Sequence, residues 1–297
     1  MNKLNTGKIL VPVDFSKTSL MAIKCAASML HGAKGELILL HVQKKKDILD
    51  LLIPALREKD LKKIMEHISE KLNKLSGEIK KKYDVKVSAI QADGGITSKI
   101  VEVSRKNKVG LIVMGTHGKD SGNDFFLGSN SYRVLTKSSV PVMTVLKGKE
   151  KSGFSKILIP IDSSEHSRQK VNSALSLAQR FDAELYVQGL YHKHEEEYFK
   201  YKLEVILDQI QKLSKEKNVV CQTAMQVSKN HAVSVLERAK QEKADMIVAM
   251  TDQNTEFSSI ILGTYIHQII NEATVPVLCI PPQINEDNIE STLGGLW

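Results

Sequence analysis

Apolar-rich runs alternate along the chain with longer segments in which apolar residues recur every three or four positions. The runs are typical of strands buried on both faces of a sheet, and the longer segments are typical of helices with one apolar face. In the first half, the expected strands are Ile9–Val13, Leu37–Val42, Val85–Ala92, Val109–Met114 and Val140–Val145. The clearest expected helix runs from about Leu56 to Lys82.

Strands that alternate with helices in this way predict an α/β fold. Right-handed crossovers would give a parallel, doubly wound sheet covered by helices on both faces. Ligands of such sheets bind beyond the carboxyl ends of the strands, where the strand order switches. Four residues fall at those ends in the first half, namely Asp14, Val42, Ala92 and Gly115.

The pattern is repeated in the second half of the chain. Lys8–Ser16 returns in similar form at Lys156–Ser164, and Val140–Val145 returns at Val275–Ile280. The repeat predicts a tandem duplication whose second copy is shorter in its middle. The expected strands of that copy are Lys156–Ile161, Glu184–Leu190, Val219–Gln226, Met246–Ala249 and Thr274–Ile280.

The expected domain bounds follow from this repeat. The first domain covers residues 1–147, and a glycine-containing linker covers residues 148–155. The second domain covers residues 156–281, and residues 282–297 form an irregular tail.

Composition agrees with a globular protein of two domains. Of 297 residues, 42% are hydrophobic and 26% are charged. No apolar run approaches the roughly 20 residues that span a membrane, and no signal-peptide core opens the sequence. Cys25, Cys221 and Cys279 lie far apart in apolar contexts, as expected of reduced core residues in a cytoplasmic protein.

Charge is shared unevenly between the two copies. Half one, residues 1–150, has 27 Lys and Arg against 15 Asp and Glu, a net charge of +12. Half two, residues 151–297, has 15 against 19, a net charge of −4. A basic half suits a polyanionic ligand, although many of its lysines fit a solvated helix face. Nucleic acid is not the expected partner, because aromatic residues are only 5% and no basic–aromatic pattern appears.

A glycine-rich stretch joins the fourth strand of half one to the next expected helix, Asn130–Lys137. Two residues separate Gly115 from Gly118, nine separate Gly118 from Gly128, and Ser129 follows at once. A strand, a glycine loop and a helix N-terminus together can present backbone N–H groups to an anion. The spacing fits neither the P-loop nor the dinucleotide fingerprint. A plain flexible connection is the alternative.

This loop resembles the nucleotide-binding signature of the universal stress protein family, Gly-x2-Gly-x9-Gly-Ser/Thr. The Val11-Pro12-Val13-Asp14 opening and the closing Pro-Val strands resemble that family too, so the chain looks like a tandem universal stress protein. The resemblance implies ATP binding in half one, with Mg²⁺ held through the phosphates. It implies that some of the chain's residues flank the base and others contact ribose and phosphates. The nucleotide-binding residues so expected are Pro12, Val13, Asp14, Val42, Met114, Gly115, His117, Gly118, Gly128, Ser129, Asn130 and Ser131.

Each polar candidate also has a simpler explanation. Asp14 is expected either beside adenosine or in a turn, and both roles can hold together. His117 and Lys119 are either phosphate contacts or solvated loop residues. His192, His194 and Glu195–Glu197 lack a second ligand pair for a metal, so no protein-held metal is expected.

The loop of half two is degenerate. Aligning Gly128-Ser129 with Gly263-Thr264 places Met250 opposite Gly115 and Gln253 opposite Gly118, while Asp162 is kept. Side chains at both positions would intrude on ribose and phosphate. We therefore expect one ATP per chain, bound in half one, although backbone shifts in the second loop are the alternative.

Three function classes remain. The resemblance favours an ATP-binding regulatory protein of the stress response, with at most slow ATP hydrolysis. A scaffold that binds a lipid-like molecule and a nucleotide-using enzyme are the alternatives. The sequence provides no catalytic residue, because neither a nucleophile elbow nor an acid–base pair accompanies Ser129. The family resemblance also implies that the last strands, Val140–Val145 and Val275–Ile280, pair within the chain, with further homodimerisation left open.

Overall fold

The computed structural model describes residues 6–43, 58–116, 127–146, 153–194, 197–251 and 262–282. The elements of half one are β1 (Lys8–Pro12), α1 (Lys17–Leu30), β2 (Glu36–Gln43), α3 (Glu58–Tyr83), β3 (Lys86–Asp93), α4 (Ile96–Lys106), β4 (Leu111–Gly115), α5 (Ser129–Lys137) and β5 (Val142–Val145). Those of half two are β6 (Lys156–Ile161), α6 (Glu165–Arg168), α7 (Val171–Phe181), β7 (Glu184–Tyr191), α8 (Glu197–Glu216), β8 (Cys221–Val227), α9 (His231–Gln241), β9 (Met246–Met250), α10 (Thr264–Glu272) and β10 (Val277–Ile280).

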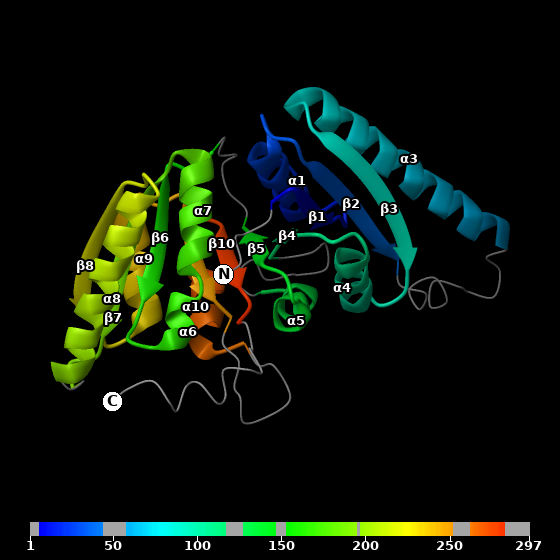
Figure 1. Cartoon of the computed structure of the whole chain (residues 1–297). Helices are drawn as coiled ribbons and strands as arrows, with labels where there is room; N and C mark the ends of the chain where they lie inside the picture. The colour runs from blue at the N-terminus through cyan, green and yellow to red at the C-terminus, as the bar shows by residue number, and fades with distance from the viewer. Residues whose placement is uncertain are drawn as a thin grey trace.

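The ten strands of the described residues form one sheet in the order β3-β2-β1-β4-β5-β10-β9-β6-β7-β8. The five strands of each half run parallel to one another, and β5 meets β10 antiparallel, with Met143 opposite Leu278. Figure 1 shows the two halves joined along this pair of strands. The expected fold class, two tandem doubly wound α/β domains, is confirmed.

Helices cover both faces of the sheet. Along β1, Ile9 and Val11 belong to the core on one face, and Leu10 belongs to the core on the other. The first core is closed by α1, α3, α7 and α8, and the second by α4, α5, α9 and α10. Because successive residues of a strand point to opposite faces, burial on both sides explains why the strands are apolar without alternation.

One helix differs between the halves. Ser16 caps α1 by accepting the N–H of Ser19 at 3.1 Å, and Ser164 caps α6 by accepting the N–H of Ser167 at the same distance. From this shared start α1 continues to Leu30, whereas α6 stops at Arg168 and α7 begins at Val171. Half two thus repeats the plan of half one with a broken first helix.

Candidate functional site

The strand order changes direction between β1 and β4, which are neighbours although β2 and β3 lie between them in sequence. Leu10 pairs with Ile112 across this contact. Asp14 follows the carboxyl end of β1, and Gly115 ends β4. A crevice outside the ends of two such strands is the usual ligand position in a doubly wound sheet.

Asp14 supports the turn that leads into α1. Its Oδ1 accepts the N–H of Ser16 at 2.9 Å, and Ser16 then caps the helix. Half two has the same arrangement, in which Asp162 Oδ1 accepts the N–H of Ser164 at 2.8 Å. The shared geometry gives Asp14 a structural role that does not require a nucleotide.

Residues at the ends of β1 and β2 contact each other. Val13 is buried, and its carbonyl accepts the Nδ1–H of His41 at 2.7 Å. The His41 ring lies 5.4 Å from the ring of Phe15, which has a positive φ of 61°. Sequence reasoning missed both aromatic residues, although a histidine within the apolar run Leu37–Val42 is a visible signal.

Three other residues expected at the site lie near the carboxyl ends of β1, β2 and β4. Pro12 is the last residue of β1 and is half-buried. Val42 is half-buried and packs on the second core, and Met114 is buried in that core. All three lie near the carboxyl ends of their strands, and their expected contacts with a base stay predictions.

Gly115 approaches α1 closely. A Cβ at this position would lie 2.7 Å from the Cβ of Thr18, 2.8 Å from its Oγ1 and 2.9 Å from its backbone carbon. Real Cβ atoms do not come that close, so packing against the first turn of α1 already requires glycine here. Glycine was expected at this position to leave space for ribose and phosphate, whereas the structure requires it for contact with Thr18.

The two ends of the glycine-rich stretch are held together. The N–H of Gly128 donates to the carbonyl of Thr116 at 2.7 Å. Ser131, buried in the first turn of α5, donates its hydroxyl to the carbonyl of Gly115 at 2.9 Å. The N-terminus of α5 is therefore fixed beside the end of β4.

The remaining loop residues divide into two groups. Ser129 is exposed and Asn130 is half-buried at the start of α5. His117, Gly118 and Lys119 lie outside the described residues, so their expected contacts stay predictions.

The register of half two places Met250 where half one has Gly115. Gly115 pairs with Val145, and Met250 pairs with Ile280 in the matching strands. Met250 is buried and lines a pocket of about 540 Å³ at the carboxyl end of that sheet. Gln253 lies outside the described residues.

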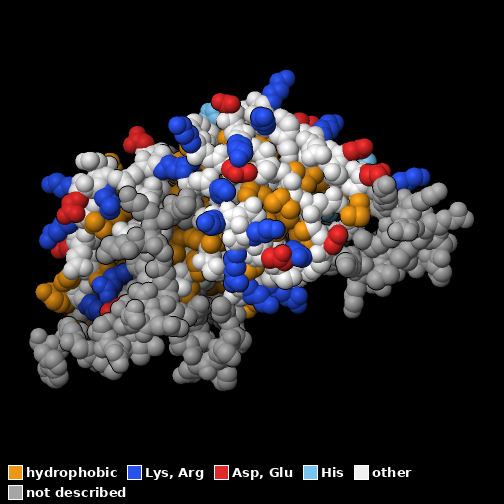
Figure 2. All heavy atoms as spheres, turned by 45° about the vertical axis from the view of Figure 1, so that its right-hand side comes forward, with side chains coloured by type: hydrophobic (Ala, Val, Ile, Leu, Met, Phe, Trp, Pro, Cys, Tyr) orange, Lys and Arg blue, Asp and Glu red, His pale blue; other side chains and the backbone are white. Residues whose placement is uncertain are grey.

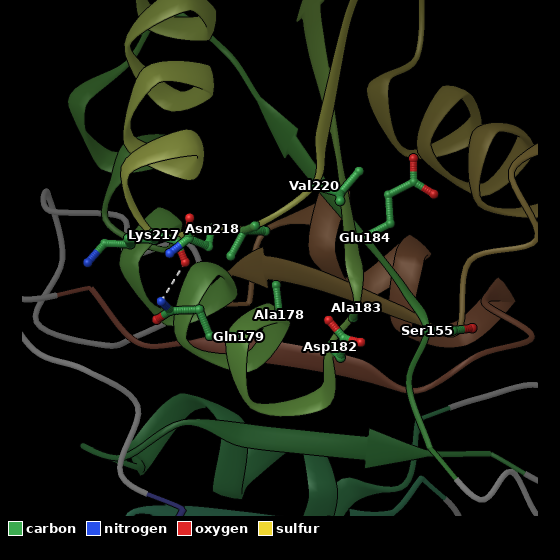
Figure 3. A pocket seen from close by; sticks show the side chains of 10 residues that line it. Ser155, Ala178, Gln179, Asp182, Ala183, Glu184, Lys217, Asn218 and Val220 are labelled. Atoms are coloured by element: carbon green, nitrogen blue, oxygen red, sulfur yellow. Dashed lines mark hydrogen bonds between the residues drawn. The ribbon is translucent and has the colours of Figure 1, made fainter.

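A second hollow of about 670 Å³ lies at the opposite, amino-terminal edge of half two, and Figure 3 shows it. Gln179 reaches across it and donates its Nε2–H to the carbonyl of Lys217 at 2.7 Å. Asp182 and Glu184 also line this hollow. Its place at the amino ends of the strands and these two carboxylates make it a poor site for a phosphate.

The described part of the chain was searched for metal-binding groups and for reactive cysteines. No group of three or more His, Cys, Asp or Glu side chains there is arranged to hold a metal ion. The cysteines are free, and burial raises the pKa of the Cys25 thiol to about 12 and that of Cys279 further. Such thiols stay protonated near neutral pH and are weak nucleophiles.

The surface carries basic side chains over much of the face in Figure 2, with hydrophobic and acidic side chains between them. On α3, Lys71, Lys74, Lys80 and Lys81 are exposed, as expected for a solvated helix face. Among the described residues, no helix combines the length and the apolar character that a membrane span needs.

The sequence matches the model of the universal stress protein family twice, over residues 5–145 and 153–281. It is 35% identical over 154 residues to a universal stress protein of Methanocaldococcus jannaschii, covering 46% of this chain and 93% of that protein. A universal stress protein of Methanothermobacter thermautotrophicus is 30% identical over 135 residues, covering 43% of this chain and 87% of that protein.

A solved structure has the same fold over nearly the whole length of the chain. The crystal structure of a universal stress protein from Archaeoglobus fulgidus matches with a TM-score of 0.72 and 18% identity, covering 96% of this chain and 99% of that one.

Proposed function

Because this chain belongs to the universal stress protein family, we propose that half one binds ATP and that the protein has a regulatory role in the stress response. The observation that carries the proposal is the position of the α5 N-terminus. The Gly128–Thr116 hydrogen bond fixes it beside the end of β4, next to the switch between β1 and β4. A triphosphate there would meet backbone N–H groups and the positive end of a helix.

The nucleotide would lie along the carboxyl edge of the sheet of half one. Val13, Val42 and Met114 provide apolar contacts for the base, and Asp14 lies beside the ribose. Gly118, Gly128 and Ser129 would face the phosphates, and Mg²⁺ would be held chiefly by phosphate oxygens and water. The net charge of +12 on half one favours a polyanion at this edge.

Regulation fits the site better than rapid catalysis. Among the described residues near α5, the hydroxyl of Ser131 is already bonded to Gly115, and no acid–base pair accompanies the exposed Ser129. We propose at most slow hydrolysis, far below the roughly 10 s⁻¹ that is the median of enzymes.

We also propose that the domains cover residues 1–147 and 156–281, with residues 148–155 as linker. In solution the two domains would pair within the chain through β5 and β10, and the antiparallel register of these strands supports this proposal. Their interface includes a hydrogen bond from Arg180 of α7 to the carbonyl of Met29. To test this pairing, the linker is cleaved and the mass of the product is measured by light scattering. If the domains pair, both fragments stay together and the mass is that of the intact chain.

Identifying what the protein carries tests the main proposal. Purified protein is denatured, and the released small molecules are separated by chromatography and identified by mass spectrometry. Release of adenine nucleotide supports ATP binding. A retained fatty chain without nucleotide, together with no ATP binding by the stripped protein, would show that the site belongs to another ligand.

A further inference from the structure

The rings of Tyr132 and His267 contact each other between the two halves. Their centroids lie 6.2 Å apart and their planes form an angle of 71°, which is an edge-to-face arrangement. Tyr132 is the fourth residue after Gly128, and His267 is the fourth residue after Gly263, the glycines that precede α5 and α10. The two residues therefore occupy equivalent positions in the two halves, with a phenol in one half and an imidazole in the other.

Each ring supports the loop exit of the opposite half, but by a different route. The hydroxyl of Tyr132 accepts the N–H of Leu262 directly. His267 acts through Asn271, which lies one turn later on α10. Nδ2 of Asn271 lies 3.2 Å from Nδ1 of His267, and Oδ1 of Asn271 accepts the N–H of Leu127. The exit of the glycine-rich loop of half one thus depends on a relay of two side chains.

The hydrogen bonds of this relay fix the protonation state of His267. A backbone N–H can only donate, so the atom of Asn271 that faces Leu127 has to be its oxygen. The amide nitrogen then faces His267 and can also only donate, which leaves Nδ1 of the ring as the acceptor. An imidazole that accepts at Nδ1 is neutral and carries its proton on Nε2.

A proton on Nδ1 of His267 is incompatible with this arrangement. Imidazolium has only N–H donors, so the amide nitrogen of Asn271 would face a second donor. If the amide turns over, its oxygen accepts a charge-assisted hydrogen bond from the ring, and such bonds are about twice as strong as neutral ones. Turning the amide is therefore favoured over turning the ring away. The amide nitrogen then faces the N–H of Leu127, and the hydrogen bond at the loop exit is lost.

The surroundings of His267 bear on its charge. Among the described residues, His267 forms no ion pair, and Tyr132 is the titratable group of α5 that contacts its ring. The charged or titratable side chains on α5 and α9, which pack around α10, and on α10 itself are Tyr132, Arg133, Lys137, His231, Glu237, Arg238, Lys240 and Glu272. Histidine is the side chain that ordinarily changes charge between about pH 5 and about pH 8, whereas phenols stay protonated over that range.

We propose that His267 is a proton-controlled switch for the loop exit of half one. The proposal rests on the proposed function, because that loop is the one expected to hold ATP. Above the range in which histidine takes up a proton, the neutral ring keeps the oxygen of Asn271 turned toward Leu127. As the pH falls through that range, the hydrogen bond is lost and the affinity for ATP decreases. The exit of the other loop does not respond, because a phenol hydroxyl holds it.

The switch is tested first without nucleotide. The amide signals of Leu127 and Leu262 in the full, nucleotide-stripped chain are followed by nuclear magnetic resonance from about pH 8 to about pH 5.5, where histidine takes up its proton. We expect the Leu127 signal to shift with the same midpoint as the ring signals of His267, whereas the Leu262 signal stays in place. A Leu127 signal that does not change, or that follows a different midpoint, would overturn the proposal.

Two matched variants identify the group that takes up the proton. His267→Asn keeps a possible acceptor near the position of Nδ1 but cannot titrate, so it should abolish the pH response of Leu127. His31→Asn is the control, because His31 follows the end of α1 at the opposite edge of half one, and it should leave the response intact. A response that persists in His267→Asn, or that disappears in both variants, would overturn the assignment to His267.

The consequence for the nucleotide is measured by titration calorimetry with ATP. Between about pH 8 and about pH 6, the affinity of the parent should fall about threefold to tenfold more than that of His267→Asn, the effect of one hydrogen bond. Comparing the two proteins removes the contribution of protons that ATP itself takes up. An equal pH dependence in both would overturn the link between the switch and the nucleotide.

Failure of the proposed function would be visible separately. A chain that binds no ATP at either pH would refute ATP binding in half one. The Leu127 signal, which is recorded without nucleotide, would still decide whether His267 controls the loop exit.

Discussion

The backbone N–H of Leu127 donates a hydrogen bond of 2.7 Å to the side-chain oxygen of Asn271, so a residue of half two holds the exit of the glycine-rich loop of half one. The reverse contact exists as well, since the N–H of Leu262 donates to the Tyr132 hydroxyl at 3.2 Å. Leu127 and Leu262 each precede the glycine that starts the next helix, α5 or α10. Each half therefore positions the loop exit of the other.

Asn271→Ala should weaken ATP binding although Asn271 lies in the other half. The substitution removes the acceptor that holds the N–H of Leu127 at the loop exit. One hydrogen bond contributes about 1 kcal/mol, so we expect the affinity for ATP to fall about threefold to tenfold. Titration calorimetry measures it. Glu272→Gln, an exposed neighbour on α10, serves as the control. Equal affinities in the two variants would contradict the coupling.

Gly118→Val should block the approach of phosphate to the backbone of the loop. ATP affinity should fall at least about tenfold, roughly 1.4 kcal/mol, while the melting temperature stays the same, because loop side chains cost little stability. Calorimetry and thermal melts on one preparation give both values. Unchanged affinity in a variant with unchanged melting would refute the site in half one.

Asp14→Ala and Asp162→Ala form a matched pair. Each removes the acceptor for a serine N–H ahead of a helix, so each should lower the free energy of unfolding by about 1 kcal/mol. Asp14→Ala should also reduce ATP affinity if the carboxylate contacts the nucleotide, whereas Asp162→Ala should not. Urea unfolding and calorimetry separate the two effects. Identical ATP affinities would leave Asp14 with its turn role alone.

Gly115→Ala should destabilise half one even without ligand, because the added Cβ meets Thr18. Overpacking of this kind costs about 1–3 kcal/mol, and Thr18→Ala should recover part of it. Gly77→Ala in α3 is the control, since nothing lies within 4 Å of its Cβ position and alanine favours a helix. A Gly115→Ala protein as stable as the parent would contradict the close packing.

Calorimetry on nucleotide-stripped protein should give one ATP per chain. In half two the buried Met250 stands at the Gly115 position and Gln253 at the Gly118 position, so we expect half two not to bind ATP with the loop geometry expected for half one. Met250→Gly restores glycine at one of the two positions that differ from half one and leaves Gln253 at the other. This variant should therefore still bind one ATP per chain. A value near two for the unmodified chain would show that the second loop binds ATP by another geometry.

The sequence was sufficient to predict the fold because burial on both faces leaves a strong signal in each strand. Bounds were less accurate: the strand expected from Val109 begins at Leu111, and the one expected from Val140 begins at Val142. Apolar residues that lead into a strand are buried before its ladder starts, as Val109 is. The hydrophobic pattern alone cannot distinguish a buried residue that leads into a strand from a residue of the strand itself.

The site was harder to predict. Spacing identified the glycines, but the reason for Gly115 is a contact with Thr18, which is distant in sequence. His41 contacts Val13 across neighbouring strands. The contact of Gly115 with Thr18 depends on three-dimensional packing, which no local pattern shows. The histidine within the apolar run Leu37–Val42 was a visible signal, but its partner could not be read from the sequence.

The antiparallel contact of β5 with β10 has a consequence for how the two copies could diverge. Joining two edge strands through one chain makes their association unimolecular, with an effective concentration that reaches the millimolar range for short linkers. The ladder of three residue pairs and the loop contacts of Leu127 and Leu262 then act within one chain. Dilution cannot separate such a pair, and each copy always meets the same unlike neighbour. One loop could thereby carry Met250 and Gln253 at two glycine positions and keep only Gly263, while the other loop has glycine at all three.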